Sequence, residues 1–314
     1  MTVTQETVNN QASTGPLIPT RQKPQGKNRI FNQADRFAQG WYWAVRSHAL
    51  KPNTRQALTL LGREIVLHRD RNNKLLTTDA ADPTQSWPTE ERYGLVWIWI
   101  GLTHEATQPL PQVPELDEHP CDAIVSDSFN RKCHPNVLLI NAIDAHHFNS
   151  VHNLPLEIRF ETTALSNAAL QFNNVTRGGE ASRFVRIIRP LYKKEVTYRL
   201  CYWYGSTGSV TLGPDFLHFY LMFALRPGNN GTTEGQMVLL TPKRPGLHGK
   251  LFNLILLGIT QLVANYFAKG DRHVFDSIKF DFKVPLAADR SILEFIKHVD
   301  QQPALTWKTW SSSI

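Results

Sequence analysis

Hydrophobic and polar positions alternate near the start of this chain in short blocks that are typical of β-strands. Gly40–Arg46 is aromatic and β-branched, and Leu58–Arg69 contains two apolar blocks around a Gly62-Arg63 turn. Glu91–Gly101 is apolar enough to form one buried strand. Because such blocks, separated by turn residues, indicate strands, we predict a small antiparallel β domain over residues 39–104.

A Pro-rich connector, Leu102–Glu118, marks a domain boundary. The elements predicted beyond it are a strand at Ala123–Lys132, a helix at Asn136–Val151, β segments between Glu157 and Pro242, and helices at about 249–268 and 287–300. Strands followed by helices predict an α+β fold, with helices packed on an antiparallel sheet, over residues 105–314.

Composition indicates a folded globular protein, since 41% of the 314 residues are hydrophobic and 19% are charged. Met1 to Arg29 is polar and has no signal-peptide core, so we expect a disordered arm that ends near residue 38. The three widely spaced cysteines, Cys121, Cys133 and Cys201, do not form a disulfide framework. A reducing, cytoplasmic setting is therefore expected.

The net charge of +7 is moderate, and the basic residues do not form a run of five or more. Nucleic-acid binding is therefore disfavoured. A basic face could instead bind an acidic partner such as a ferredoxin.

One strongly apolar stretch, Leu251–Val263, is too short to span a membrane, which takes about 20 apolar residues. A buried or pocket-covering helix is the expected structure. Lys243, Arg244 and Lys250 precede the stretch. The alternative is therefore a peripheral membrane contact through residues 247–267.

The chemistry-bearing motif contains Asp144, the adjacent His146 and His147, and His152. Residues three apart share a helix face, whereas five residues turn a helix by about 500°. The helix must therefore end, or take a π-type turn, before His152 can meet an earlier histidine at one metal. Asn149-Ser150 is a plausible place for this irregularity.

Two imidazoles and a distant carboxylate can form the 2-His-1-carboxylate triad that binds non-haem Fe(II). The alternative is a His-rich helix whose histidines are solvated or packed in the core.

The spacing N-x-x-D-x-x-H-x-x-x-x-H resembles the iron motif of the Rieske-type aromatic ring-hydroxylating oxygenases. This resemblance favours His147 over His146, because His147 has the family's register with Asp144. It implies His147 and His152 as iron ligands, with Asp144 and Asn141 as catalytic residues beside them. In the family, the aspartate at this position hydrogen-bonds an iron ligand and also a cluster histidine of the neighbouring subunit. Such a carboxylate orients the imidazole.

The resemblance implies a third ligand from a distant carboxylate. The segment from Gly270 to Asp276 follows the apolar helix and resembles the family's D-x-x-(I/V)-(W/F)-(E/D) region. It implies Asp271 as the ligand, with Asp276 as the alternative.

The family's Rieske [2Fe-2S] cluster needs two cysteines and two histidines, supplied as C-x-H and C-x-x-H, and neither pattern occurs in this chain. Leu61–Asp70 and Trp87–Trp99 resemble the strands that flank the cluster loops. Only Arg71–Ser86 lies between them, a few dozen residues fewer than in the family. The chain resembles an α subunit whose cluster loops are missing.

The resemblance therefore implies a truncated Rieske-type β domain at 39–104 and a helix-grip catalytic domain at 105–314, in a homotrimer. It implies O2-dependent oxidation of an apolar aromatic or polycyclic substrate at mononuclear Fe(II), with electrons from ferredoxin or a reductase. Without cluster ligands, impaired activity is expected. One alternative is an inactive paralogue that binds an apolar ligand or regulates another protein, and a second is a mixed oligomer in which another chain supplies the cluster.

Overall fold

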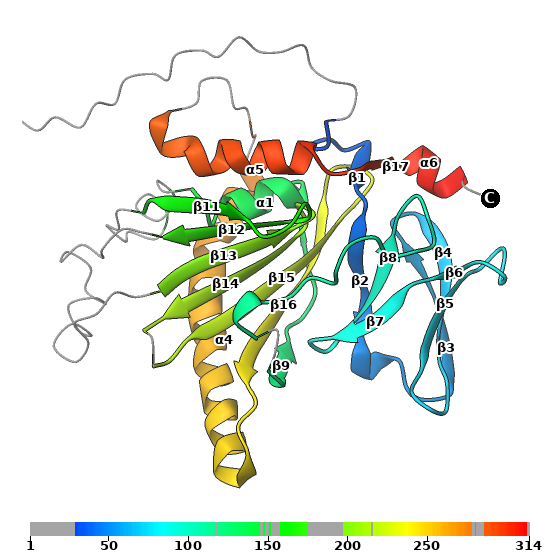
Figure 1. Cartoon of the computed structure of the whole chain (residues 1–314), viewed down its shortest axis with the longest axis horizontal. Coiled ribbons are helices and arrows are strands. Elements are labelled where there is room, and N and C mark those ends of the chain that lie inside the picture. The colour runs from blue at the N-terminus through cyan, green and yellow to red at the C-terminus, as the bar shows by residue number, and fades with distance from the viewer. Residues whose placement is uncertain are drawn as a thin grey trace, which may run out of the picture.

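Aromatic and β-branched segments near the N-terminus form two small antiparallel sheets (Figure 1). The computed structural model describes residues 29–116, 119–144, 147, 151, 158–174, 197–214, 216–277, 280 and 286–312. One sheet has the order β2-β8-β7 and the other β3-β4-β5-β6. The strands are β2 (Gly40–Arg46), β3 (Thr54–Leu60), β4 (Arg63–Arg69), β5 (Leu75–Asp79), β6 (Ser86–Trp87), β7 (Thr89–Arg92) and β8 (Leu95–Ile100).

The prediction of one strand over Glu91–Gly101 was wrong, because the chain reverses direction at Tyr93-Gly94. Both residues have positive φ, +57° and +76°, as a two-residue hairpin turn requires. β7 and β8 pair across this turn, from Arg92↔Leu95 onward. The prediction for Gly40–Arg46 was confirmed, since β2 has these bounds.

The larger part of the chain is built on an eight-stranded antiparallel sheet of order β10-β16-β15-β14-β13-β12-β11, with β9 also paired to β16. Its strands are β9 (Cys121–Val125), β10 (Phe129–Arg131), β11 (Phe160–Ala164), β12 (Ala169–Asn174), β13 (Thr197–Trp203), β14 (Thr207–Gly213), β15 (Phe219–Pro227) and β16 (Thr233–Pro242). The single strand predicted at Ala123–Lys132 is thus two strands, and both pair with β16.

Helices cover this sheet, which gives the α+β architecture that the sequence predicted (Figure 1). The helical elements are α1 (Pro135–Ile140), α4 (Gly246–Ser277), α5 (Arg290–Asp300), α6 (Trp307–Ser312) and the 3-10 turns η1 (Ser47–Ala49), η2 (Pro114–Leu116) and η3 (Ala287–Asp289). The two late helices predicted are α4 and α5. The helix predicted over Asn136–Val151 is interrupted, because α1 ends at Ile140, residues 141–143 form a turn, and His147 is again helical.

Alternate residues of β16 pack on opposite faces of the sheet, as the strand period of two requires. Met237 and Leu239 pack against α4, whereas Val238 and Leu240 join the main core. Farther along α4, Phe275 also joins the main core. The long helix α4 therefore starts on the outer face of the sheet and ends at the main core.

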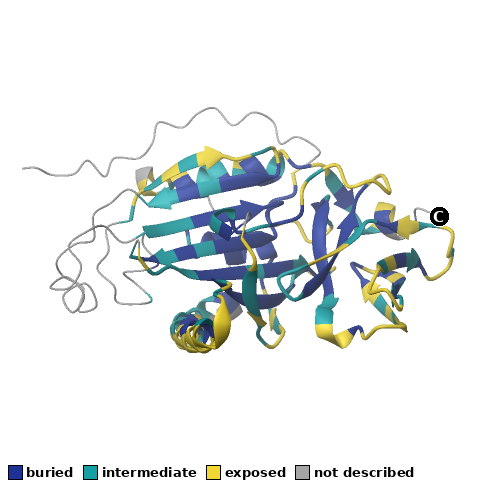
Figure 2. Ribbon diagram, turned by 60° about the horizontal axis from the view of Figure 1, so that its bottom comes forward, coloured by how far each residue is buried: buried dark blue, intermediate teal, exposed yellow. Residues whose placement is uncertain are grey.

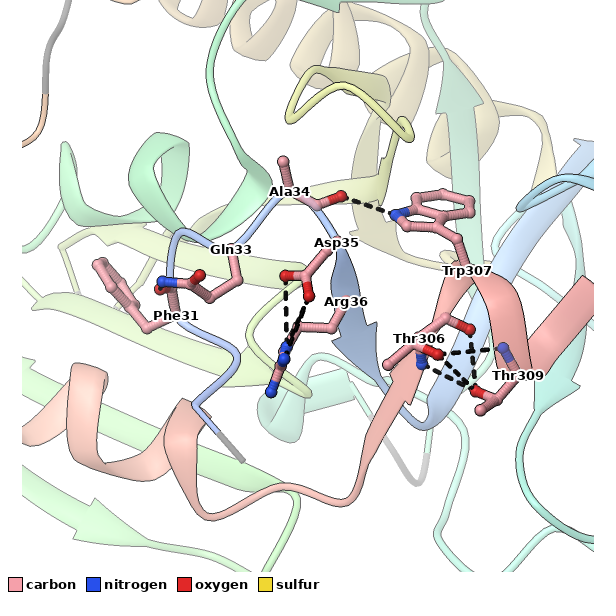
Figure 3. Close-up of polar contacts among 8 residues, drawn as sticks. All are labelled: Phe31, Gln33, Ala34, Asp35, Arg36, Thr306, Trp307 and Thr309. Carbon is pink, nitrogen blue, oxygen red and sulfur yellow. Dashed lines mark hydrogen bonds and ion pairs between the residues drawn. The ribbon is translucent and has the colours of Figure 1, made fainter. Parts of the chain in front are cut away.

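The two ends of the described chain pair with each other, so the arm expected over residues 1–38 was placed too far into the chain. β1 (Arg36–Ala38) pairs with β17 (Ala304–Thr306), and Ile30 is buried. Figure 3 shows the indole Nε1 of Trp307 donating to the Ala34 carbonyl at 2.8 Å. Leu305, Trp307 and Trp310, near the C-terminus, pack in the core of the small sheets rather than with residues 105–303.

A buried ion pair organises the core of the small sheets. The Arg63 guanidinium donates to the Asp79 carboxylate, and the two side chains are only 6% and 4% exposed. Arg63 also lies 5.0 Å from the Trp87 ring and 5.1 Å from the Trp310 ring. Burial opposes ionisation of Asp79, but the bonds from Ala81 N–H and Arg63 outweigh it and lower its pKa. The pair is charged at neutral pH.

We predict that Asp79→Asn lowers the free energy of unfolding by about 3–5 kcal/mol, because it leaves the buried Arg63 charge uncompensated. The pH dependence follows from the sign of the shift. The lowered pKa stabilises the fold above about pH 4, and this contribution is lost as the pH falls through the lowered value. Urea denaturation followed by tryptophan fluorescence, between about pH 7 and pH 3, measures both effects.

The matched control is Asp127→Asn, because Asp127 pairs with Arg46 at 3.2 Å but is fully exposed. Its free energy of unfolding should stay close to that of the wild type. Equal losses in the two variants would show that the burial of Arg63 and Asp79 does not determine the effect.

Candidate metal centre

The structure brings together two of the three predicted ligands. His147 Nε2 lies 2.8 Å from Asp271 Oδ1, although the two residues are 124 positions apart. Their side chains are 5% and 17% exposed. Asp271 lies within α4, not after it as the sequence predicted, because the helix continues to Ser277.

The chain reaches His147 through a series of satisfied carbonyls after α1. The last carbonyls of a helix have no partner within it and must find one elsewhere. Tyr202 OH donates to the Leu139 carbonyl at 2.7 Å, and Tyr198 OH donates to Ala142 at 2.8 Å. Ser291 Oγ of α5 donates to Ile143 at 3.0 Å. Side chains of β13 and α5 therefore hold the segment that precedes Asp144.

Backbone hydrogen bonds then carry the turn through the motif. Asp144 N–H donates to the Ile140 carbonyl at 3.0 Å, and His147 N–H donates to the Asp144 carbonyl at 3.2 Å. Val151 N–H donates to the His147 carbonyl at 2.9 Å. Asp144 thus supports His147 through its backbone, and Asn141 is the C-cap residue of α1.

The start of α1 is capped by a histidine that remains neutral. His134 Nδ1 accepts from Asn136 N–H at 3.3 Å, and Pro135 begins the helix. Burial lowers the pKa of His134 to about 4. The imidazole therefore keeps the lone pair that the cap needs at neutral pH.

Tyr198 connects this anchoring to Asp271. Burial, and secondarily the nearby Asp271 charge, raises the pKa of the Tyr198 phenol far above its usual value. The phenol therefore stays protonated and can donate to Ala142. Its ring packs against that of Phe160, with the ring centroids 5.7 Å apart.

The other predicted site residues are only partly visible. His152, and the alternative ligand His146, lie outside the described residues. Asp276 lies in the last turns of α4, and its side chain is not among those described. Within the described part of the chain, groups of three or more metal-binding side chains do not occur.

The donor pair fits a mononuclear metal. Two ligands about 2.1 Å from one ion and at right angles to each other have donor atoms roughly 3 Å apart. The 2.8 Å between His147 Nε2 and Asp271 Oδ1 agrees with this spacing. One imidazole and one carboxylate are also two of the three donors in the ferrous triad. The same distance equally suits a hydrogen bond from the imidazole to the carboxylate.

The cysteines lie away from the small sheets. The first 120 residues contain no cysteine. Cys121 is in β9, Cys201 is in β13, and the buried Cys133 precedes α1. A cluster that needs two thiolates has no such ligands in the small sheets.

The sequence did not identify Tyr198, Tyr202 or Ser291. Tyr198 and Tyr202 are four residues apart on β13, so both are expected on the same side of the strand. That pattern predicts a buried face, but it does not show which carbonyls the hydroxyls meet.

No protein-family model and no curated protein sequence matches the chain. Its fold is similar to that of dicamba monooxygenase bound to dicamba, with a TM-score of 0.53 and 13% identity, covering 84% of this chain and 96% of that chain. Its fold is also similar to that of Pseudomonas putida CBB5 NdmB, with a TM-score of 0.56 and 15% identity, covering 82% of this chain and 89% of that chain. A chain from the oxygenase–ferredoxin complex of carbazole 1,9a-dioxygenase is similar with a TM-score of 0.53 and 12% identity, covering 90% of this chain and 93% of that chain. The chain shares the fold of these solved structures, which include one named a monooxygenase and one named a dioxygenase.

We predict that Tyr198→Phe lowers the free energy of unfolding by about 1–3 kcal/mol, because it leaves the Ala142 carbonyl without its donor. Urea denaturation measures the change. Tyr266→Phe is the matched control, because Tyr266 is 64% exposed and lies on α4. The anchoring role of Tyr198 is refuted if both variants unfold like the wild type.

Proposed function

We propose that this protein is a non-haem iron oxygenase that oxidises an apolar aromatic or polycyclic substrate with O2. Fe(II) would be held by His147, His152 and Asp271. The observation that carries the proposal is the contact between His147 and Asp271, since the iron motif alone does not require it. The structural neighbours support it, because they include both monooxygenases and dioxygenases.

The residues of the chain have separate roles in this proposal. His147 and Asp271 present an imidazole and a carboxylate at a largely buried point. Tyr198 and Ser291 hold the backbone before the motif and so restrict where His147 can lie. Phe160 and Phe275 help to keep water away from this end of the core. When bound, iron supplies the one-electron and dioxygen chemistry that side chains lack.

Electrons would have to come from outside the chain. We infer that the small sheets form a truncated Rieske-type domain, beside a helix-grip domain that carries the iron. The buried Arg63–Asp79 pair and its tryptophans pack the core there. The chain carries a net charge of +7, which suits an acidic donor such as a ferredoxin. A homotrimer, or a mixed oligomer with a cluster-containing chain, would bring a donor cluster close.

The absence of cluster cysteines favours a second candidate, an apolar-ligand-binding or regulatory protein that does not oxidise its ligand. The two candidates differ in their need for metal, because only the oxygenase requires bound iron. Iron content therefore separates them before a substrate is known.

We predict that purified protein reconstituted with Fe(II) anaerobically binds about one iron per chain, as a single triad does. His147→Ala, His152→Ala and Asp271→Ala should each lower the affinity for iron by more than about 100-fold. Loss of a hydrogen bond that only supports a ligand lowers metal affinity by about 10–100-fold, and loss of the ligand itself should cost more. Metal analysis after desalting measures iron per chain.

His146→Ala and Asp276→Ala are the matched controls and should keep their iron. If the His146 variant loses its iron and the His147 variant keeps it, His146 is the ligand and the assignment of His147 is wrong. Wild-type protein that binds no iron, while keeping its fold by circular dichroism, would favour the ligand-binding candidate.

With NAD(P)H, ferredoxin and its reductase, oxygen consumption and product formation should stay near background. The reason is that the chain has no ligands for an internal electron relay. Oxygen-electrode traces and mass spectrometry on a panel of apolar aromatic compounds measure both. Adding a Rieske-containing homologue should raise both rates. Efficient turnover by this chain with ferredoxin and reductase alone would contradict the prediction.

A further inference from the structure

The outward side of α4 is apolar and exposed along most of its length. Figure 2 shows the helix close to end-on, with much of its outer side exposed. We call this surface the outer face of α4. Its members are 44–82% exposed and are Leu247, Leu251, Leu254, Ile255, Ile259, Leu262 and Tyr266. Soluble monomers rarely expose so contiguous an apolar strip, which indicates an interaction surface.

The opposite side of α4 is firmly attached to the sheet. Leu257 and Ala264 pack against residues of β15 and β16, and Asn253 is 1% exposed. The Asn253 amide donates to Asp122 at 2.7 Å and to the Pro242 carbonyl at 3.0 Å. Gly246–Asp271 has the length and apolarity of a membrane span, since an 18-residue window within it has a mean hydropathy of 1.6. Crossing a membrane would nevertheless break these contacts, so the helix meets its partner sideways.

Charge distinguishes among partners. From Lys243 to Gly270 the chain contains no aspartate or glutamate. Lys243, Lys250 and Lys269 are exposed near the two ends of the outer face. Two copies of α4 packed along their apolar strips would juxtapose stretches that carry lysines but no acidic residue between Lys243 and Gly270, so these cations would not be paired along the strip. A surface that is apolar inside and anionic at its edge matches both properties.

We propose that the outer face of α4 inserts sideways into a phospholipid surface that contains anionic lipids. From Leu247 to Tyr266 the face is about 28 Å long. An in-plane helix of this kind sinks roughly 5–10 Å into the boundary between headgroups and acyl chains. Lys243, Lys250 and Lys269 then lie at the level of the headgroup phosphates. This proposal does not depend on the proposed iron chemistry.

Vesicle flotation of the full-length protein tests the proposal. The vesicles are phosphatidylcholine alone and phosphatidylcholine mixed with phosphatidylglycerol. Wild-type protein should float with the mixed vesicles, bind phosphatidylcholine more weakly, and be partly released by salt. Leu254→Gln with Leu262→Gln should weaken binding to mixed vesicles at least about tenfold, because two apolar side chains no longer insert.

Lys243→Gln with Lys250→Gln should weaken binding to the mixed vesicles by about fivefold for each lysine. It should leave binding to phosphatidylcholine unchanged. The matched apolar control is Leu76→Gln with Leu102→Gln, because Leu76 in β5 and Leu102 just after β8 are 45% and 73% exposed and lie outside α4. It should bind like the wild type. Circular dichroism verifies that each variant is folded, and Leu247→Gln with Leu251→Gln replaces the first pair if that pair unfolds.

Wild-type protein that floats with neither kind of vesicle overturns the proposal. A second result would also overturn it: the wild type forms an oligomer in light-scattering measurements, Leu254→Gln with Leu262→Gln dissociates this oligomer, and the wild type does not bind vesicles. The outer face of α4 would then join copies of the chain. Equal loss of binding in the Leu76–Leu102 control also overturns it, because the effect would not be local to α4.

Discussion

The structure depends on how the backbone is satisfied after α1. A six-residue helix ends inside the protein, and its free carbonyls cannot be left without donors there. Hydroxyls from Tyr202, Tyr198 and Ser291 meet Leu139, Ala142 and Ile143 in turn. These bonds tie one segment to both β13 and α5, and they determine where the chain lies when it reaches His147. His147, a few residues farther along, lies opposite Asp271.

The long helix α4 joins two different environments. From Leu247 to Tyr266 it packs one side on β15 and β16 and leaves the other side apolar and exposed. Its second half carries Asp271 to His147 and places Phe275 in the main core. Because one rigid helix connects the two regions, the candidate lipid-facing surface and the candidate metal centre are held in a constant relation.

The small sheets have a core of unusual composition. The Arg63 guanidinium lies about equally close to the Trp87 and Trp310 rings, which also contact each other, and it pairs with Asp79. A carboxylate and two aromatic rings therefore compensate the buried charge. Trp310 comes from the C-terminal segment, and β17 pairs with β1 beside it. The two ends of the described chain thus complete a domain that the middle of the sequence cannot complete alone. The small sheets and the C-terminal segment that packs on them contain no cysteine.

Local periodicity by itself determined much of the architecture: the strand Gly40–Arg46, the α+β order of elements and the two late helices all follow from it. The Tyr93-Gly94 hairpin was missed because the apolar run Leu95–Ile100 was extended back through the turn to Glu91, although a glycine inside a strand pattern indicates an irregularity. The motif indicated His147, and resemblance indicated Asp271, but only the tertiary structure places them 2.8 Å apart. It also showed that the apolar stretch is half-covered and half-exposed. The physical reason is range: spacing along the chain reports neighbours within a helix or strand, whereas contacts between distant segments depend on how the whole chain buries its apolar surface and satisfies its polar groups.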